Sequence, residues 1–229
     1  MYTIAHIEND YTGKFGVPRQ SGLVSEVTSL IVFEPEFRNA DALRGLESFT
    51  HIWLIWEFSE AKRRGAEEEN DWRPTVRPPR LGGNTRIGVF ATRSPFRPNP
   101  IGLSCVELEG IEYETERGPV IRVKGADLMN GTPILDIKPY IPYADCRPEA
   151  GGGFTDETGF EKVEVVLPDE VAGLLTAEEA AGLKAVLAQD PRPAYQRGQE
   201  RAYTFRFSRY DVSFAAKGGI LTVTGIKRI

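Results

Sequence analysis

The sequence of 229 residues contains little cysteine and histidine and no long apolar run. Cys105, Cys146, His6 and His51 form none of the closely spaced pairs of zinc or iron sites, so we expect no metal. Two cysteines allow one disulfide at most, which fits a reducing cytosol. The longest apolar run, residues 52–56, is far shorter than the about 20 residues of a membrane-spanning helix. No signal peptide is visible, so we expect a cytoplasmic protein with no membrane segment.

The common nucleotide-binding and hydrolase fingerprints are absent too. The sequence has no G-x-G-x-x-G, no G-x-x-x-x-G-K-[ST], no H-E-x-x-H and no G-x-S-x-G. Strand-like segments do not alternate with helices of ordinary length, so a doubly wound parallel sheet is not expected. If the protein binds a nucleotide-like cofactor, it does so without a Rossmann scaffold.

Charge is distributed unevenly along the chain. The net charge of −5 argues against a protein that coats nucleic acid by bulk attraction. Residues 72–103, however, contain six arginines and no acidic residue, directly after an acidic run at residues 67–71. The six are Arg73, Arg77, Arg80, Arg86, Arg93 and Arg97. On charge alone, this arginine segment is either an anion-binding surface or a solvated loop.

Short segments rich in β-branched and aromatic residues indicate a mainly β, α+β protein. Strands are expected at residues 2–7, 27–33, 51–58, 87–92, 103–113, 120–125 and 134–141. The nearly wholly apolar segment 51–58 is typical of a central strand buried on both faces, which would place Trp53 and Trp56 in the core. Only residues 39–46 are predicted helical in this part, with Asn39 or Asp41 as the cap.

A different pattern follows the three glycines at residues 151–153. We place a domain boundary at residues 146–155, which gives domains at 1–146 and 155–229. In the second domain, Thr176 and Glu179 form a capping box before a helix that carries Leu183 and Leu187 on one face. Strands are expected at residues 162–167, 203–207, 210–215 and 220–226, with a turn at residues 217–219 between the last two.

The most unusual segment is residues 90–104. Its three prolines fix their own φ angles and push the preceding residues towards extended conformations, which predicts a stiff loop. Arg93, Arg97 and Asn99 would project from a nearly pre-set backbone, which suits a polar recognition site because little entropy is lost on binding. The alternative is a proline-braced connection whose arginines only cap carbonyl groups. Trp72, at the start of the arginine segment, is a candidate for stacking on a base.

Two further clusters carry polar residues. Residues 127–133 contain the turn signal Asn130-Gly131. Asp136 and Lys138 lie two residues apart on an expected strand and share a face. On spacing alone, a simple ion pair explains them better than catalysis does.

Residues 72–84, 93–102, 127–133, 136–143 and 187–195 together resemble the TsaA-like (TrmO) family of tRNA methyltransferases, so the resemblance covers most of the chain. It implies N6-methylation of threonylcarbamoyladenosine beside the anticodon, in tRNA that accepts threonine, with S-adenosylmethionine as the donor. It also implies a non-Rossmann, β-barrel-like cofactor domain, a small α+β C-terminal domain and a homodimer with the site near the interface.

The resemblance assigns residues as well. Those matched to the cofactor are Pro18, Arg19, Gln20, Ser59, Glu60, Arg93, Leu103, Asp127, Leu128, Met129 and Asn130. The family commonly has Asp where this chain has Asn130, and the pair Ser59-Glu60 varies within the family. Arg77, Arg80, Arg97, Asn99 and Tyr140 are predicted to contact the substrate, whose threonyl carboxylate and phosphates suit guanidinium groups.

Methyl transfer is an in-line displacement, so the enzyme mainly holds donor and acceptor in near-attack geometry. Because the lone pair of the acceptor nitrogen is delocalised, we expect help with proton removal. Asp136 is the hypothesised general base, with Lys138 or Tyr140 orienting the substrate. Two alternatives stay open: a non-catalytic module that binds S-adenosylmethionine, and a methyltransferase for a small molecule.

Overall fold

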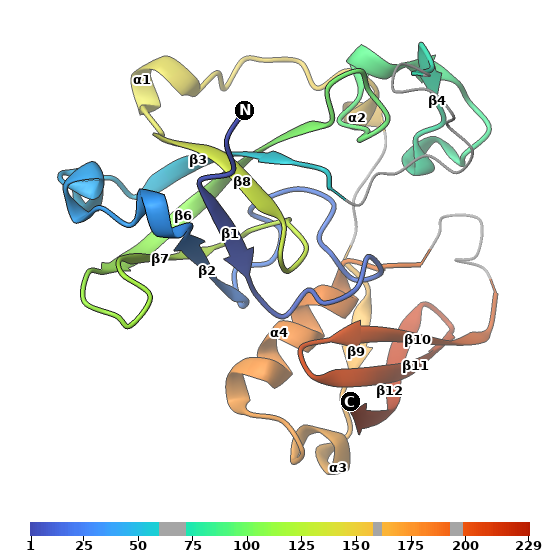
Figure 1. Ribbon diagram of the computed structural model, residues 1–229. Coiled ribbons are helices and arrows are strands. Elements are labelled where there is room, and N and C mark those ends of the chain that lie inside the picture. The colour runs from blue at the N-terminus through green and yellow to red at the C-terminus, as the bar shows by residue number, and fades with distance from the viewer. Residues whose placement is uncertain (60–71, 158–161, 193–198) are drawn as a thin grey trace.

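The structure is a computed structural model that describes residues 1–59, 72–157, 162–192 and 199–229. Six strands close into an antiparallel barrel in the order β1-β2-β7-β6-β3-β8 (Figure 1). They are β1 (Ala5–Glu8), β2 (Thr28–Phe33), β3 (His51–Glu57), β6 (Ile101–Glu112), β7 (Val120–Lys124) and β8 (Pro133–Pro139). Closure pairs every barrel strand on both sides and so removes the sheet edges. The expected mainly β fold with an N-terminal barrel is confirmed.

Strand β3 shows what barrel closure does to an apolar run. Ile52, Leu54 and Trp56 are buried inside, whereas Trp53 and Ile55 are only half-buried on the outer wall. The prediction that both faces of this strand are buried is therefore wrong, because a barrel has a single inner face. Trp56 is a core residue as expected. Trp53 instead donates a hydrogen bond from Nε1 to Oδ2 of Asp145, at 3.1 Å.

The irregular parts of the barrel domain are mostly single helical turns. The expected helix at residues 39–46 is reduced to one 3-10 turn, η2 (Ala40–Leu43), which the Asn39 side chain caps as predicted. Gly45, with φ of +89°, turns the chain before a longer helix can form. The expected strand at residues 87–92 is only β5 (Ile87–Gly88), paired with β4 (Thr75–Val76) and followed by η5 (Val89–Ala91). The other short turns are η1 (Pro35–Phe37), η3 (Leu46–Ser48) and η4 (Pro79–Leu81).

The C-terminal part forms a second sheet, in the order β10-β11-β12-β9, with helices against one face. Its elements are β9 (Glu164–Val166), α3 (Asp169–Ala172), α4 (Ala177–Ala188), β10 (Arg201–Phe207), β11 (Tyr210–Lys217) and β12 (Ile220–Arg228). The predicted capping box starts α4: the Thr176 hydroxyl accepts from the Glu179 amide, and the Glu179 carboxylate accepts from the Thr176 amide. Leu183 and Leu187 are fully buried, as expected for one face of that helix.

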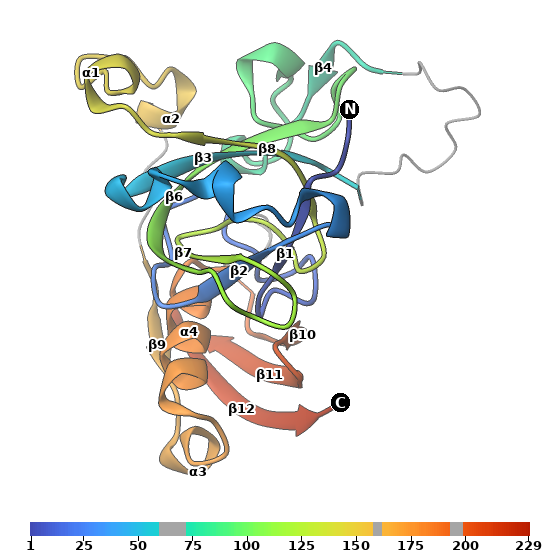
Figure 2. The same cartoon turned by 60° about the vertical axis from the view of Figure 1, so that its left-hand side comes forward.

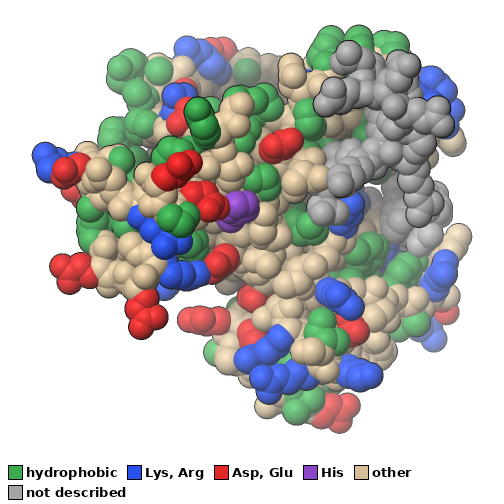
Figure 3. Space-filling model, in the orientation of Figure 1, with side chains coloured by type: hydrophobic (Ala, Val, Ile, Leu, Met, Phe, Trp, Pro, Cys, Tyr) green, Lys and Arg blue, Asp and Glu red, His purple; other side chains and the backbone are tan. Residues whose placement is uncertain are grey.

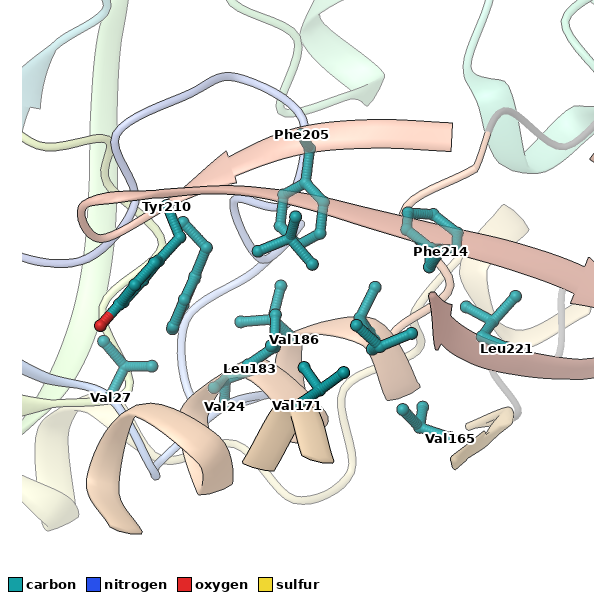
Figure 4. Packing of buried hydrophobic residues seen from close by; sticks show 14 of the residues in the cluster. Val24, Val27, Val165, Val171, Leu183, Val186, Phe205, Tyr210, Phe214 and Leu221 are labelled. Carbon is teal, nitrogen blue, oxygen red and sulfur yellow. The ribbon is translucent and has the colours of Figure 1, made fainter. Parts of the chain in front are cut away.

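The core under this small sheet includes residues from far upstream. Tyr11, Val24 and Val27 belong to the same buried cluster as Leu183 and Phe214. Figure 4 shows Val24 and Val27 beside the helix and Tyr210, among side chains that come from the C-terminal sheet. The segment between β1 and β2 therefore leaves the barrel and packs on the small sheet. These N-terminal residues therefore belong in space to the C-terminal core, although most of the barrel strands follow them in the sequence.

The barrel and the small sheet lie one above the other, as Figures 1 and 2 show. Between β8 and β9 the chain forms two short helices, α1 (Pro142–Asp145) and α2 (Phe154–Glu157). Within the described residues, no helix is long and apolar enough to cross a membrane.

Lys and Arg side chains gather over the small sheet in the lower part of Figure 3. Residues 201–229 contain six cationic residues, Arg201, Arg206, Arg209, Lys217, Lys227 and Arg228, against one acidic residue, Asp211.

Candidate functional site

A large open hollow lies where one end of the barrel meets the arginine segment, residues 17–20 and the connection to the small sheet. Its volume is about 1820 Å³, enough for a nucleoside-sized ligand together with part of a larger one. Residues from β3 and β6 form its floor, and residues 73–99 form much of its wall. Figures 1 and 2 both place β4 and the loop after it beyond one end of the barrel.

The charged groups that line the hollow are strongly unequal in sign. The lining arginines are Arg19, Arg73, Arg77, Arg86, Arg93 and Arg97. Among the described lining residues, Asp127 is the single carboxylic acid. Such a surface attracts phosphates and carboxylates, because guanidinium groups bind both in a bidentate way. At Asp127, the same surface also has a carboxylate that suits a cationic group of a ligand.

Asp127 lies at the bottom of a chain of hydrogen bonds that begins in the barrel core. The Trp56 indole Nε1 donates to Ser104 Oγ at 2.9 Å, and that hydroxyl donates to Asp127 Oδ1 at 2.5 Å. Burial raises the pKa of the Asp127 carboxyl above its ordinary value of 3.8, while the Ser104 hydroxyl, backbone amides including that of Ser21, and the charge of Arg93 act in the opposite direction. The hydrogen bonds thus fix the position of the Asp127 side chain, while burial disfavours its charged form.

The floor of the hollow depends on one glycine. In the antiparallel pairing of β3 with β6, Trp56 lies opposite Gly102, and the indole covers the glycine. A Cβ atom at position 102 would stand 2.2 Å from Trp56 Cε2 and 2.4 Å from Cζ2. Both distances are far inside the about 3.5–4.0 Å of ordinary carbon contact. Glycine at this position lets the indole lie flat on the strand and reach Ser104.

The arginine segment is braced from within and tied to the N-terminal part. Arg97 Nη1 donates to the carbonyl oxygen of Thr92 at 2.9 Å, so this guanidinium caps a carbonyl group, as the structural alternative for the proline-rich loop supposed. Arg93 Nη1 instead donates to Gln20 Oε1 at 2.5 Å, across the hollow's edge. Trp72 is partly exposed, with its ring 5.7 Å from that of Phe90. The segment is therefore more than a solvated loop.

The structure brings together many of the residues singled out by sequence. Those that line the hollow are Pro18, Arg19, Gln20, Arg77, Arg93, Arg97, Asn99, Leu103 and Asp127. Glu60 and the side chain of Arg80 lie outside the described residues. Ser59 is described and exposed but is not one of the lining residues.

Other predicted site residues lie away from the hollow. Leu128 is fully buried in the barrel core, and the turn that carries Met129 and Asn130 folds back onto the N-terminal strand, where Asn130 Oδ1 accepts from the Asn9 amide at 3.0 Å. The chain thus turns away from the hollow after Asp127, and Leu128, Met129 and Asn130 are not among its lining residues.

The residues predicted for catalysis lie on β8, also outside the hollow. Asp136 and Lys138 form an ion pair at 2.9 Å between exposed side chains, the plainer of the two readings of their spacing. Tyr140 packs with its ring 5.8 Å from that of Trp53, on the outer wall of the barrel. Their suggested roles in catalysis stay predictions.

Sequence reasoning missed Ser104, Gly102 and the site role of Trp56. Ser104 and Gly102 lie at the end of the proline-rich run, and Trp56 was assigned to the core alone. The signal that could have found them is the register of β3 against β6, which places Trp56 opposite Gly102 and Leu54 opposite Ser104. Phe90 and Phe154, two aromatic residues that line the hollow, were also not singled out.

Comparison with known proteins adds three findings. The model of the tRNA-methyltransferase O N-terminal domain matches residues 6–146, and that of the TrmO C-terminal domain matches residues 161–229. The tRNA (adenine(37)-N6)-methyltransferase of Escherichia coli K12 is 42% identical over 214 residues, which cover 91% of this chain and 88% of that protein. A putative S-adenosylmethionine-dependent methyltransferase of Pseudomonas aeruginosa is 40% identical over 216 residues, 91% of this chain and 89% of its own.

Solved structures agree with these matches. The crystal structure of TrmO from Pseudomonas aeruginosa superposes with a TM-score of 0.75 at 31% identity, over 98% of this chain and 96% of that one. The likeness thus extends over the barrel and the small sheet together.

Proposed function

Because this chain belongs to the tRNA-methyltransferase O family, we propose that its hollow binds S-adenosylmethionine beside the anticodon loop of tRNA and that the methylated base is threonylcarbamoyladenosine. The protein is an S-adenosylmethionine-dependent tRNA (adenine-N6)-methyltransferase. The observation that supports this proposal is the hollow itself, which among the described residues is lined by six arginines and one carboxylic acid, the half-buried Asp127.

The donor supplies an electrophilic methyl group on a sulfonium, and it also carries an ammonium and a carboxylate. Asp127 suits one of the cationic groups, since a carboxylate in a desolvated site interacts strongly with a cation. Arg19 or Arg93, which also line the hollow, suits the donor carboxylate. We propose that these three side chains fix the donor and that Pro18 and Leu103 give it apolar contact.

The threonylcarbamoyl group of the proposed substrate adds a second carboxylate to the phosphates of the anticodon loop. Arg77 is exposed on the wall of the hollow and suits such an anion. Arg97 also lines the hollow, and one of its N–H groups is bound to the carbonyl oxygen of Thr92. We propose that Arg77 and Asn99 contact the tRNA. Asp136, which pairs with Lys138, stays the hypothesised proton acceptor, and an Asp136→Asn enzyme with an unchanged single-turnover rate would eliminate that role.

Replacing Arg77 with alanine is expected to weaken tRNA binding about 10-fold, because a hydrogen bond to a charged group contributes about 1.5–3 kcal/mol. The slope of log K against log salt should become less steep by about 0.7–0.9, the loss of one phosphate contact. Affinity for S-adenosylmethionine should stay within about twofold. Filter binding at several salt concentrations measures both effects. Arg44→Ala, which removes an exposed arginine paired with Asp41, is the matched control; equal salt slopes for the two variants would contradict the assignment.

We propose a homodimer in which the second copy covers the rim of the hollow. Phe90 is 71% exposed, Leu103 54% and Phe96 45%, which is unusual for three large apolar side chains around one site. Covering them would also exclude water from the reacting groups. Light scattering at micromolar protein is expected to give twice the mass of 25.5 kDa. A monomer that is fully active at the same concentration would refute the dimer. We also propose that the chain divides into a barrel domain, residues 1–146, and a small domain, residues 155–229.

The function is tested with total tRNA from a strain that lacks its own enzyme of this kind. The purified protein is incubated with S-adenosylmethionine carrying a labelled methyl group, and the nucleosides are then separated. Label in threonylcarbamoyladenosine of threonine-accepting tRNA supports the proposal. Label in unmodified adenosine would refute the substrate but keep the reaction type. Donor binding without any label in tRNA would indicate a binding module or an enzyme for a small molecule.

A further inference from the structure

We propose that the small C-terminal sheet is the platform for residues 17–20 of the hollow and that the buried Asp190–Arg192 ion pair is the positioning device for Arg19. This inference rests on the proposed binding of the donor in the hollow. It gives the small domain a part in donor binding, although the donor site lies at the end of the barrel.

Residues 15–17 pack on the small sheet. The ring of Phe15 stacks on those of Tyr203 and Phe214, with 6.4 Å between centroids in both cases. Gly16 has a φ of +108°, and a Cβ there would lie 2.7 Å from the ring of Phe205. Figure 4 shows Phe205 and Phe214 on the sheet above the helix α4. The chain therefore enters the hollow directly from the surface of the small sheet.

The loop that follows α4 holds the next residues at two points. Gln189 Nε2 donates to the carbonyl oxygen of Leu23 at 3.2 Å. Arg19 Nη2 donates to the carbonyl oxygen of Arg192 at 3.4 Å. Residues 19–23 are thus bound at both ends to residues 189–192, which are far away in sequence.

That loop is fixed by an ion pair that is almost fully buried. Arg192 Nε donates to Asp190 Oδ1 at 2.7 Å and Nη2 donates to Oδ2 at 3.1 Å, with both side chains only 4% exposed. Asp190 adopts a φ of +48°, a left-handed conformation that few non-glycine residues take. A buried ion pair gains little net stability over apolar residues, because desolvation offsets the attraction. Its geometry, however, determines where the Arg192 carbonyl group points, and the oxygen of this group accepts the hydrogen bond from Arg19.

The restraint continues into the hollow. Gln20, next to Arg19, accepts the hydrogen bond from Arg93 at 2.5 Å, and Arg93 acts on the Asp127 carboxyl through its charge. Contacts therefore run from the small sheet to the groups proposed to hold the donor. A displaced loop at residues 189–192 should change donor affinity first and tRNA affinity much less.

The test uses Arg192→Lys, which keeps a cation opposite Asp190 but cannot make the two parallel hydrogen bonds. We expect the Kd for S-adenosylmethionine to rise about 10-fold and the KM for tRNA to change less than about twofold. Arg209→Lys is the matched control, because Arg209 pairs with Glu179 at 3.0 Å within the same small domain. It should lower the melting temperature without changing the Kd. Equal Kd values for the two variants would overturn the proposal.

A double-mutant cycle separates positioning from general destabilisation. If Arg192 acts through Arg19, adding Arg192→Lys to Arg19→Met should raise the Kd by less than about twofold. Fully independent effects would contradict the coupling. If Arg192→Lys does not fold, Gln189→Met removes the bond to the Leu23 carbonyl and should raise the Kd about threefold or more, whereas an unchanged Kd would refute the platform. Failure of the wild-type protein to bind the donor would refute the proposed function itself, which is a separate outcome.

Discussion

Alanine at position 102 is expected to cost the protein both its donor affinity and part of its stability. The added methyl group would stand 2.2–2.5 Å from three atoms of the Trp56 ring. The ring cannot move away without breaking its hydrogen bond to Ser104, which in turn orients Asp127. Overpacking of this kind typically costs about 1–3 kcal/mol. Loss of the oriented carboxylate adds an about 10-fold to 100-fold increase in the Kd for S-adenosylmethionine.

Strand β6 itself supplies the control for this experiment. Gly110 lies on the same strand, and a Cβ there would meet nothing within 4 Å. Gly110→Ala should therefore melt close to the wild type and bind the donor normally. Thermal melting and calorimetry on the two variants measure the difference. If Gly102→Ala behaves like Gly110→Ala, the contact between Trp56 and Gly102 does not shape the floor of the hollow.

Asp127→Asn is expected to make the protein more stable and much less active. Burial raises the pKa of this carboxyl above 3.8, so the folded protein binds its proton more tightly than the unfolded chain does. Its contribution to stability is therefore lost as pH rises from 3.8 through the raised pKa, and the charged form is a burden at neutral pH. Asparagine keeps an oxygen acceptor for Ser104 without the charge. Without a carboxylate for the donor cation, the Kd for S-adenosylmethionine should rise about 10-fold to 100-fold.

The pH dependence distinguishes this explanation from a general effect of the substitution. The melting temperature of Asp127→Asn should exceed that of the wild type at neutral pH, and the gap should narrow as the pH falls and the wild-type carboxyl takes up its proton. Asp41→Asn removes an exposed carboxylate that is paired with Arg44, so it should change stability by no more than about 0.5 kcal/mol. A less stable Asp127→Asn protein that retains full activity would show that the carboxylate supports the fold and does not contact the donor.

Local sequence signals predicted the local structure well. The capping box of Thr176 and Glu179 and the turn with Gly218 and Gly219 depend on neighbouring residues only, and both are present. The apolar run of β3 was misjudged, because the sequence shows how apolar a strand is but not that the sheet closes into a barrel with one inner face. The helix expected at residues 39–46 was shortened by Gly45, which takes a left-handed conformation.

Part of the site could also be predicted, but from composition and from the family resemblance and not from local structure signals. The proline-braced arginines could be recognised by composition, and the resemblance supplied Pro18, Arg19, Gln20 and Asp127. The bonds among Trp56, Ser104 and Asp127 come from three separate parts of the barrel, so they appear only once the strand register is known. The packing of Phe15 and Val27 on the small sheet joins segments more than 150 residues apart, and no local pattern predicts such a contact.

Titration calorimetry of the 229-residue chain with S-adenosylmethionine tests the central claim most directly. The claim is that the arginines around the half-buried Asp127, the one carboxylic acid among the described lining residues, form the donor site with it. We predict saturable heat with one site per chain and a Kd of about 1–100 µM, in the range usual for small substrates of enzymes. The same titration should give much weaker binding for Asp127→Asn. Well-folded wild-type protein that shows no saturable heat at about 1 mM donor would contradict the account.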